Sequence, residues 1–399
     1  MTPGAGIFRT QLPQGFVAAG VNCGVRRYRP DLGIVISQVP AVAAGVFTQS
    51  TCQAAPVRYS QALLPADNIR AVITNSGQAN AATGPQGELD NQAMVTAVAQ
   101  QLQCETHQVL SASTGVIGEP MEVDKITAAV PELCQSTSDI AEKFALAVMT
   151  TDLVPKTVMK KITLSQGEVC ITGVAKGSGM IHPNMATMLG YLLTDVALDT
   201  AAAAHGLKAV TDHSFNMISV DGDTSTNDSV FLLANGASGV SLATSADQEI
   251  FWAALQEVAI VLAKSIARDG EGATKLIEAQ VKNSPTLALA QQVARGLTMS
   301  PLIKTAIYGE SPNWGRFIGR LGAEQVPVEI LQQVSLRFQG MTLFSAEQPQ
   351  AVDAAKLKQL MQQDTVVLEV DMHAGEQMAT AWGCDLSERY VKINAEYVS

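Results

Sequence analysis

The segment Lys176–Thr194, KGSGMIHPNMATMLGYLLT, decides the fold, because a predicted strand hairpin leads directly into its glycine-rich start. The hairpin pairs Lys160–Leu164 with Glu168–Val174. Glycines such as Gly177 and Gly179 leave backbone N–H groups free and let the main chain approach a ligand closely. A P-loop is excluded because GxxxxGK[ST] is absent. Composition alone also allows an ordinary strand-to-helix turn.

Strands and helices alternate on both sides of this segment, which is typical of an α/β protein. Apolar runs bounded by glycine and proline predict the strands, and apolar residues at helical spacing predict the helices. Ser138 is the expected N-cap of its helix, and periodicity does not fix the strand order. The predicted strands are Leu32–Pro40, Ala41–Thr48, Ile69–Thr74, Val109–Ser113, Val230–Ala234, Lys275–Val281, Ile330–Phe338 and Val366–Met372; the predicted helices are Asp90–Leu102, Val123–Leu133, Ser138–Met149, Ala201–His213 and Gln248–Ile266.

The composition excludes several classes of protein. The chain has 399 residues, of which 47% are hydrophobic and 16% charged, so two or three domains with sizeable cores are expected. The net charge of −11 argues against a nucleic-acid or anionic-membrane partner but allows an anionic substrate in a basic pocket. No signal peptide or membrane-spanning run is recognisable, so a cytoplasmic protein is expected.

The cysteines and histidines give no sign of a metal site or a cofactor. None of the six cysteines forms a CxxC pair, so buried, reduced thiols are expected, and the five histidines show no HExxH pattern. No Ser-His-Asp spacing supports a triad. A nucleophile without histidine needs another base, and an N-terminal Thr supplies its own α-amine.

Four further segments carry candidate functional residues, each with a purely structural alternative. Thr114-Gly115 ends a strand in a turn that can form an oxyanion site or be an ordinary turn. Asp221–Asp228, DGDTSTND, lacks the spacing of an EF-hand and is interpreted as a polar turn supporting a site. Arg268–Lys275 is either a solvated helix end or a contact to a substrate ammonium. Ser311–Arg316 is interpreted as packing around its tryptophan.

Together these residues resemble the ornithine acetyltransferase family, also called glutamate N-acetyltransferase. The matching segments occur in order along nearly the whole chain, and the last one closes it. They are NSGQANAATG (Asn75–Gly84), STGVIG (Ser113–Gly118), MTTDLVPK (Met149–Lys156), GVAKGSGMIHPNMATML (Gly173–Leu189), DGDTSTND (Asp221–Asp228), ARDGEGATK (Ala267–Lys275), SPNWGR (Ser311–Arg316) and INAEYVS (Ile393–Ser399).

The resemblance implies a layered α/β sandwich of the ornithine acetyltransferase/aminopeptidase superfamily that cleaves itself between Ala186 and Thr187. The products would be an α chain, 1–186, carrying the oxyanion loop, and a β chain, 187–399, with the nucleophile Thr187 at its N-terminus. Two copies of each would form a heterotetramer. Thr114 and Gly115 match the oxyanion pair, and the implied substrate contacts are Thr151, Lys176, Thr187, Glu271, Asn394 and Ser399.

The implied activity is a step of arginine biosynthesis. Thr187 would take the acetyl group from N2-acetylornithine, release ornithine and pass the acetyl group to glutamate, giving N-acetylglutamate by ping-pong kinetics. No cofactor or metal is implied, and the sequence leaves open whether acetyl-CoA is a second donor. The family often has Ala at His182, Cys at Ala82 and Thr at Ser399.

Two other functions are compatible with the same residues. A hydrolase of the same superfamily would use the same N-terminal nucleophile and release the acyl group to water, as an aminopeptidase does. A non-catalytic amino-acid-binding protein would use the glycine-rich loops as a ligand cradle and would stay uncleaved.

Overall fold

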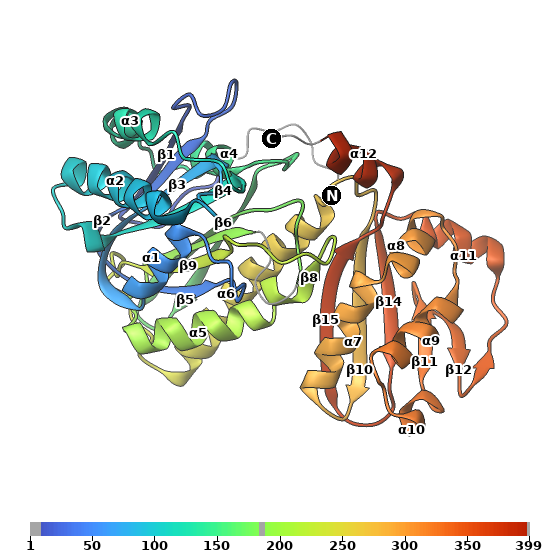
Figure 1. Cartoon of the computed structure of the whole chain (residues 1–399). Coiled ribbons are helices and arrows are strands. Elements are labelled where there is room, and N and C mark those ends of the chain that lie inside the picture. The colour runs from blue at the N-terminus through green and yellow to red at the C-terminus, as the bar shows by residue number, and fades with distance from the viewer. Residues whose placement is uncertain (1–8, 183–187, 397–399) are drawn as a thin grey trace.

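The computed structural model describes residues 9–182 and 188–396, which form two lobes, each built on one β-sheet (Figure 1). Strands of the first lobe are β1 (Phe16–Val21), β2 (Leu32–Phe47), β3 (Ala66–Gln78), β4 (Val109–Val116), β5 (Lys156–Leu164), β6 (Gly167–Lys176), β7 (Leu189–Thr194) and β9 (Ser229–Ala234). Their order is β4-β3-β2-β9-β7-β6-β5, with β1 also paired to β2. Sheets layered with helices confirm the predicted α/β sandwich.

Helices cover the first sheet and are capped by local side chains. α2 (Gly84–Leu102) and α3 (Val123–Gln135) pack near β1, β2 and β4, while α5 (Thr200–Asp212) and α6 (Ser245–Arg268) pack on β2, β5 and β6. The Asp199 side chain accepts from the Ala202 amide at 2.7 Å, and Thr244 and Asp247 form a capping box at the start of α6. Two shorter helices, α1 (Ala55–Leu63) and α4 (Glu142–Val148), complete this lobe.

The second lobe holds the other sheet and the C-terminal helix α12. Its sheet has the order β13-β12-β11-β14-β10-β15-β8. The strands are β8 (Ile218–Ser219), β10 (Leu276–Ser284), β11 (Ser335–Phe338), β12 (Met341–Ser345), β13 (Gln348–Pro349), β14 (Thr365–Asp371) and β15 (Gln377–Cys384). Its helices are α7 (Leu287–Met299), α8 (Pro301–Tyr308), α9 (Trp314–Ala323), α10 (Val328–Leu331), α11 (Ala354–Met361) and α12 (Glu388–Glu396). Of the two short 3₁₀ turns, η1 (Thr106–Gln108) lies between α2 and β4 of the first lobe, and η2 (Phe215–Met217) directly precedes β8.

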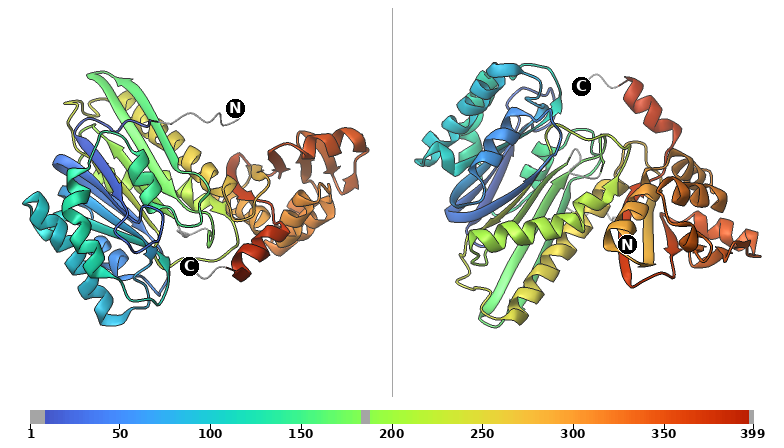
Figure 2. Two further views of the ribbon diagram at one scale, coloured as in Figure 1. Left: turned by 90° about the horizontal axis from the view of Figure 1, so that it is seen from above. Right: turned by 60° about the horizontal axis from the view of Figure 1, so that its bottom comes forward.

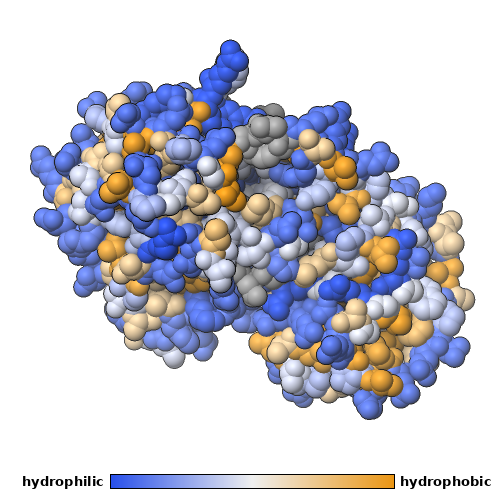
Figure 3. Space-filling view, in the orientation of Figure 1, coloured by the Kyte–Doolittle hydropathy of each residue, from blue (hydrophilic) through white to orange (hydrophobic). Residues whose placement is uncertain are grey.

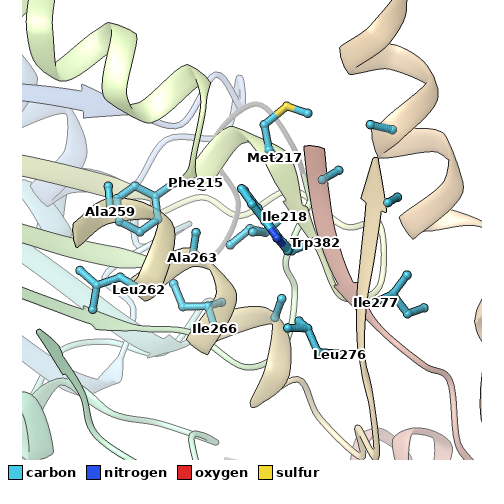
Figure 4. Close-up of a cluster of buried hydrophobic side chains, with 14 of the residues drawn as sticks. Phe215, Met217, Ile218, Ala259, Leu262, Ala263, Ile266, Leu276, Ile277 and Trp382 are labelled. Carbon is cyan, nitrogen blue, oxygen red and sulfur yellow. The ribbon is translucent and has the colours of Figure 1, made fainter. Parts of the chain in front are cut away.

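A hydrophobic cluster joins the two lobes. Side chains from η2, β8 and α6 meet side chains from β10 and β15, including Trp382 (Figure 4). α6 is long and apolar enough to cross a membrane by length and composition, and the packing of its buried side chains on both sheets accounts for that apolar character. Two further views show the lobes on either side of this junction (Figure 2).

Most predicted elements are present, but the separate strands Leu32–Pro40 and Ala41–Thr48 are one strand, β2. Pro40 lacks a backbone N–H, and the ladder to β3 shifts register between Ile36 and Ala41. The strand therefore continues through an irregularity rather than ending in a turn. Its first half pairs with β1, and its second half pairs with β9, from Val42 opposite Ala234 onward.

Three local predictions are wrong. Ser138 is not an N-cap, because it exchanges backbone hydrogen bonds with Ala18 at 2.8 and 2.9 Å and α4 begins only at Glu142. The predicted strand Ile330–Phe338 begins within helix α10, and its strand is limited to β11. All six cysteines are free as expected, but only Cys170 and Cys384 are buried, whereas Cys52 is exposed and Cys23, Cys104 and Cys134 are partly buried.

Candidate active site

A pocket of about 170 Å³ collects the predicted site residues that the structure describes. Six of them line it: Thr114, Gly115, Thr151, Lys176, Glu271 and Asn394. Ala186, Thr187 and Ser399 lie outside the described residues. The remaining lining residues are Ala79, Ile117, Thr150, Gly179, Met180, Ser225, Thr226 and Asn227.

The predicted oxyanion turn, Thr114-Gly115, is built where β3 and β4 run parallel to each other. Thr114 is opposite Ser76, and Gly115 is opposite Gly77. Gly115 has a φ of +135°, and a Cβ there would lie 2.2 Å from the Gly77 carbonyl carbon. Glycine is therefore required at position 115, both by its conformation and by the close approach of the neighbouring strand.

Lys176 lies at the end of β6 with its ammonium group in the pocket. The side chain is 2% exposed, and Nζ donates to Thr114 Oγ1 at 3.2 Å and to Thr150 Oγ1 at 2.9 Å. Burial lowers the pKa of this ammonium, and the Asp152 carboxylate opposes the change. Because Thr114 Oγ1 accepts from Lys176, its own hydroxyl proton is free to donate to another group.

Asp152 holds this part of the site together; it lies in the matched MTTDLVPK segment but is not among the predicted site residues. Its carboxylate accepts from the Gly177 amide at 2.7 Å, the Thr150 amide at 3.0 Å and Lys156 Nζ at 2.7 Å. Burial alone would raise the pKa of Asp152, but the Lys176 and Lys156 ammonium groups hold it below its usual value. The carboxylate thereby fixes both the start of the glycine-rich loop and the backbone beside Lys176.

The DGDTSTND segment supports the pocket walls, as predicted. Asn227 Nδ2 donates to the Ala79 carbonyl at 2.6 Å and to the Ser113 carbonyl at 2.8 Å. The Asp221 carboxylate accepts from the Met180 and Ile181 amides at 2.6 and 2.9 Å. These bonds connect the end of β4 and the glycine-rich loop to one polar turn.

Asp228 ends the same segment and is fully buried. Its Oδ1 accepts from the Met188 amide at 2.9 Å, whereas Oδ2 has no hydrogen-bond partner in the part of the chain that the structure describes. Burial raises the pKa of this carboxyl well above its usual range. The backbone directly after the predicted nucleophile is thus anchored to a buried acid.

The Glu271 carboxylate faces the same pocket as the Lys176 ammonium. The Asn394 side chain, on α12, donates to Glu271 Oε2 at 2.8 Å, and the Glu271 amide donates to the Ser178 carbonyl at 2.9 Å. A Cβ at Gly179 would lie 2.4 Å from the Glu271 carboxyl carbon, so a side chain at this position would displace the Glu271 carboxylate. The pocket therefore carries an ammonium and a carboxylate.

Comparison with known proteins identifies the family. A model of the ArgJ family matches residues 17–399. The chain belongs to the ArgJ family. The arginine biosynthesis bifunctional protein ArgJ of Oceanobacillus iheyensis is 46% identical over 388 residues, covering 96% of this chain and 95% of that protein. Those of Thermotoga neapolitana and Bacillus subtilis are 44% and 45% identical, covering 97% and 96% of this chain and 99% and 95% of those proteins.

Two solved structures from related proteins match parts of the chain. ArgJ of Bacillus halodurans is 39% identical, with a TM-score of 0.49, and covers 51% of this chain and 96% of that chain. The ornithine acetyltransferase of Mycobacterium tuberculosis, solved with ornithine, is 39% identical, with a TM-score of 0.41, and covers 43% of this chain and 92% of that chain. Membership in the ArgJ family confirms the predicted resemblance and makes the chain an acetyltransferase of arginine biosynthesis.

The ArgJ pocket also contains groups that sequence reasoning missed. The Thr150 hydroxyl, like that of Thr114, accepts a hydrogen bond from the Lys176 ammonium, and Ser225 and Thr226 add hydroxyls to the lining. Thr150 lies in the matched MTTDLVPK segment, and Ser225 and Thr226 lie in DGDTSTND, so position within a matched segment was the available signal. Within residues 9–182 and 188–396, no three His, Cys, Asp or Glu side chains come together as a metal site.

His182, a predicted departure from the family pattern, precedes the predicted cleavage bond by four residues in the sequence. Its Nδ1 is buried and has no hydrogen-bond partner among the described residues. Burial lowers the pKa of the imidazole, and the positive charge of Arg295 lowers it further. The ring is therefore biased toward its neutral form.

Proposed function

We propose that this ArgJ family member moves acetyl from N2-acetylornithine to glutamate through an acetyl ester on Thr187, and that acetyl-CoA is a second acetyl donor. We further propose that the chain first cleaves itself between Ala186 and Thr187. The relatives' description as bifunctional arginine biosynthesis proteins supports two donors. The observation that carries the proposal is the contact between the buried Lys176 ammonium and the Thr114 hydroxyl in a pocket of small-molecule size.

The chemistry follows from the way this contact orients Thr114. In turnover, the Thr187 hydroxyl attacks the acetyl carbonyl while the Thr187 α-amine takes the hydroxyl proton. A free α-amine titrates near ~8, so a fair fraction is neutral at pH 7. The Thr114 hydroxyl, already accepting from Lys176, donates its proton to the oxyanion together with the Gly115 amide. Before cleavage, the same pair stabilises attack of the Thr187 hydroxyl on the Ala186 carbonyl, and water hydrolyses the resulting ester, which leaves the Thr187 α-amine and hydroxyl free.

Charges in the pocket suit amino-acid substrates. Lys176 is available to a substrate carboxylate as well as to the oxyanion, and the Glu271 carboxylate is suited to the ornithine ammonium. Thr151 and Asn394 add hydrogen-bonding groups to the wall, and Ser399 is assigned as a further contact through the resemblance. The substrates and products are N2-acetylornithine, glutamate, ornithine and N-acetylglutamate.

The proposal extends to the assembly and the location, which rest on the resemblance to the family. We assign two α and two β chains to a heterotetramer in the cytoplasm, with no cofactor, metal, nucleic acid or membrane partner. Size-exclusion chromatography with light scattering on the purified, processed enzyme tests the assembly. A heterodimer would contradict it.

Incubation with N2-acetylornithine, with and without glutamate, tests the activity. We expect ornithine release to be much faster with glutamate present and to match N-acetylglutamate formed. Release that ignores glutamate would instead favour the hydrolase. An intact, inactive chain that binds ornithine would favour the binding protein.

A further inference from the structure

A second, larger pocket adjoins the pocket described above, which we call the amino-acid pocket, at the turn of Thr114 and Gly115. It has a volume of about 470 Å³ and shares Gly115 and Thr150 with the first pocket. The amino-acid pocket, at about 170 Å³, is below the ~300–1,000 Å³ typical of sites for drug-sized ligands. Coenzyme A is larger than such ligands, so most of any acetyl-CoA bound there would extend beyond the first pocket.

The loop between β1 and β2, residues 22–31, forms one wall of this second pocket and carries three arginines. We call it the arginine loop; its sequence is NCGVRRYRPD. It projects from the first lobe beside β1 (Figure 1), and the tip of that projection is hydrophilic (Figure 3). Val25, Arg26 and Arg27 line the pocket, together with Gly77 and Gln78 of β3.

The arginine loop has a backbone that is fixed by hydrogen bonds and three exposed side chains at its tip, Arg27, Tyr28 and Arg29. The Asp31 carboxylate accepts from the Cys23 and Arg26 amides, both at 2.6 Å, and Asn22 donates to the Arg26 and Arg29 carbonyls. Arg26 itself donates to the Met149 carbonyl at 2.6 Å, which anchors the loop to the segment before Thr150. The loop is therefore held in place without using the side chains at its tip.

The tip residues offer the groups that recognise a nucleotide. Tyr28 is 82% exposed, and the Arg27 guanidinium lies 5.1 Å from its ring centroid. Arg27 and Arg29 are also exposed. Arginine binds phosphate by paired hydrogen bonds, and an exposed aromatic ring can stack on a base.

The arginine loop, the pocket lining and Lys125 together carry four cationic side chains and three carboxylates, on a chain whose net charge is −11. Two carboxylates line the pocket, and one of them, Glu122, is paired with Lys125 Nζ at 2.6 Å. Lys125 also donates to the Gly24 carbonyl at 3.1 Å, next to the arginine loop. The remaining carboxylate, Glu119, is exposed and opposes an anionic ligand.

We propose that the second pocket and the arginine loop bind the nucleotide and pantetheine arm of acetyl-CoA, so that its thioester reaches the oxyanion turn past Gly115. This inference rests on the proposed function. In the transfer step the C–S bond breaks as an ester bond forms to Thr187 oxygen. The hydroxyl proton passes through the α-amine to the departing thiolate, giving free CoA. N2-acetylornithine needs only the amino-acid pocket, so the two donors differ in their use of Arg27 and Arg29.

The test compares three acetyl donors on the processed enzyme carrying Arg27→Ala and Arg29→Ala, with glutamate as acceptor. We expect KM for acetyl-CoA to rise about tenfold or more for the double variant, because each arginine loses charge-assisted bonds to phosphate. KM for N2-acetylornithine and for S-acetyl-N-acetylcysteamine, a thioester without the nucleotide, should change less than about twofold. Arg58→Ala, which removes an exposed arginine from the same lobe, is the matched control.

A change of opposite sign and a direct binding measurement complete the test. Glu119→Gln removes the opposing carboxylate and should lower KM for acetyl-CoA without changing KM for N2-acetylornithine. Calorimetry with adenosine 3′,5′-bisphosphate should show binding to the unsubstituted enzyme and much weaker binding to the double variant. Unchanged acetyl-CoA kinetics in the double variant, or an unsubstituted enzyme that ignores acetyl-CoA, would overturn the inference. Failure of N2-acetylornithine transfer in the unsubstituted enzyme would instead overturn the proposed function.

Discussion

The two hydroxyl partners of Lys176 provide a matched pair of substitutions that separates oxyanion stabilisation from support of the lysine. Thr114→Val removes one hydroxyl acceptor of the buried ammonium and keeps the side-chain shape, and Thr150→Val removes the other. Only the Thr114 hydroxyl is proposed to donate to the oxyanion. Losing one such donor costs about 2.7–4 kcal/mol of transition-state stabilisation, so kcat of Thr114→Val should fall by about 10²–10³.

Thr150→Val should lower the stability of the protein but change turnover much less than Thr114→Val does. A hydrogen bond to a charged group contributes about 1.5–3 kcal/mol, and this loss should lower the free energy of unfolding. The hydroxyl is not aimed at the reacting carbonyl in the proposed mechanism, so kcat should remain within about tenfold, or ~1.4 kcal/mol, of the unsubstituted enzyme.

The assay must separate turnover from self-cleavage, since both are proposed to use the same oxyanion donors. N-acetylglutamate formation from N2-acetylornithine is measured under saturating substrate and divided by the fraction of cleaved chain found by mass spectrometry. A Thr114→Val enzyme whose corrected kcat stays within about tenfold would refute the oxyanion role. Equal losses of kcat in Thr114→Val and Thr150→Val would show that both act only by holding Lys176.

Three further substitutions test the nucleophile, the ammonium contact and the buried acid. Thr187→Ala should give a single chain of 42.0 kDa without acetyl transfer, and two fragments on a denaturing gel would remove Thr187 from processing. Glu271→Gln should raise KM for N2-acetylornithine more than KM for glutamate, and equal effects would indicate a structural role. Asp152→Asn should lower the free energy of unfolding in urea at pH 7 by about 3–5 kcal/mol, because the buried Lys176 loses a neighbouring carboxylate and the buried Lys156 keeps only that of Asp269. Since the pKa of Asp152 is lowered from 3.8, its stabilisation is present above that pH and is lost as pH falls below it, so the difference between the Asp152→Asn and unsubstituted enzymes should shrink in acid; a constant difference would contradict this assignment.

Local sequence was sufficient to predict elements whose ends are marked by local chemistry. The hairpin of β5 and β6 turns at a glycine after a polar pair, β9 and most of β14 are short apolar runs, and β10 alternates apolar with polar residues. β2 was divided incorrectly because Pro40 usually ends a strand, whereas here the ladder to β3 absorbs it by shifting register. Ser138 was misread because its backbone pairs with Ala18, a partner 120 positions away in the sequence that no local pattern reveals.

The candidate site likewise contains some residues that the sequence motifs predict and others that they do not. Thr114, Lys176 and Glu271 could be named because each lies in a motif that matches the family, and the structure places all three around one pocket. Asp152 also lies in a matched segment, MTTDLVPK, but its supporting role could not be predicted, because that role depends on contacts with Gly177 and with the ammonium of Lys176, which lie beyond the β5–β6 hairpin. Asp269, the second partner of Lys156, lies 113 positions from it. Such networks are set by topology, which the pattern of residues did not determine.

The topology also explains how two chains cut at the proposed bond would remain one enzyme. β7 and β9 follow residue 187, yet they lie in the middle of the first sheet, with β6 on one side and β2 on the other. Every residue of both strands is buried, and a fully buried large apolar side chain stabilises by about 1.5–3 kcal/mol. Separating the α and β chains would break the β6–β7 and β2–β9 ladders and expose both strands to water. Cleavage can therefore release an α-amine at Thr187 without releasing the chain that carries it, because the β chain supplies the centre of the sheet that positions Thr114 and Lys176.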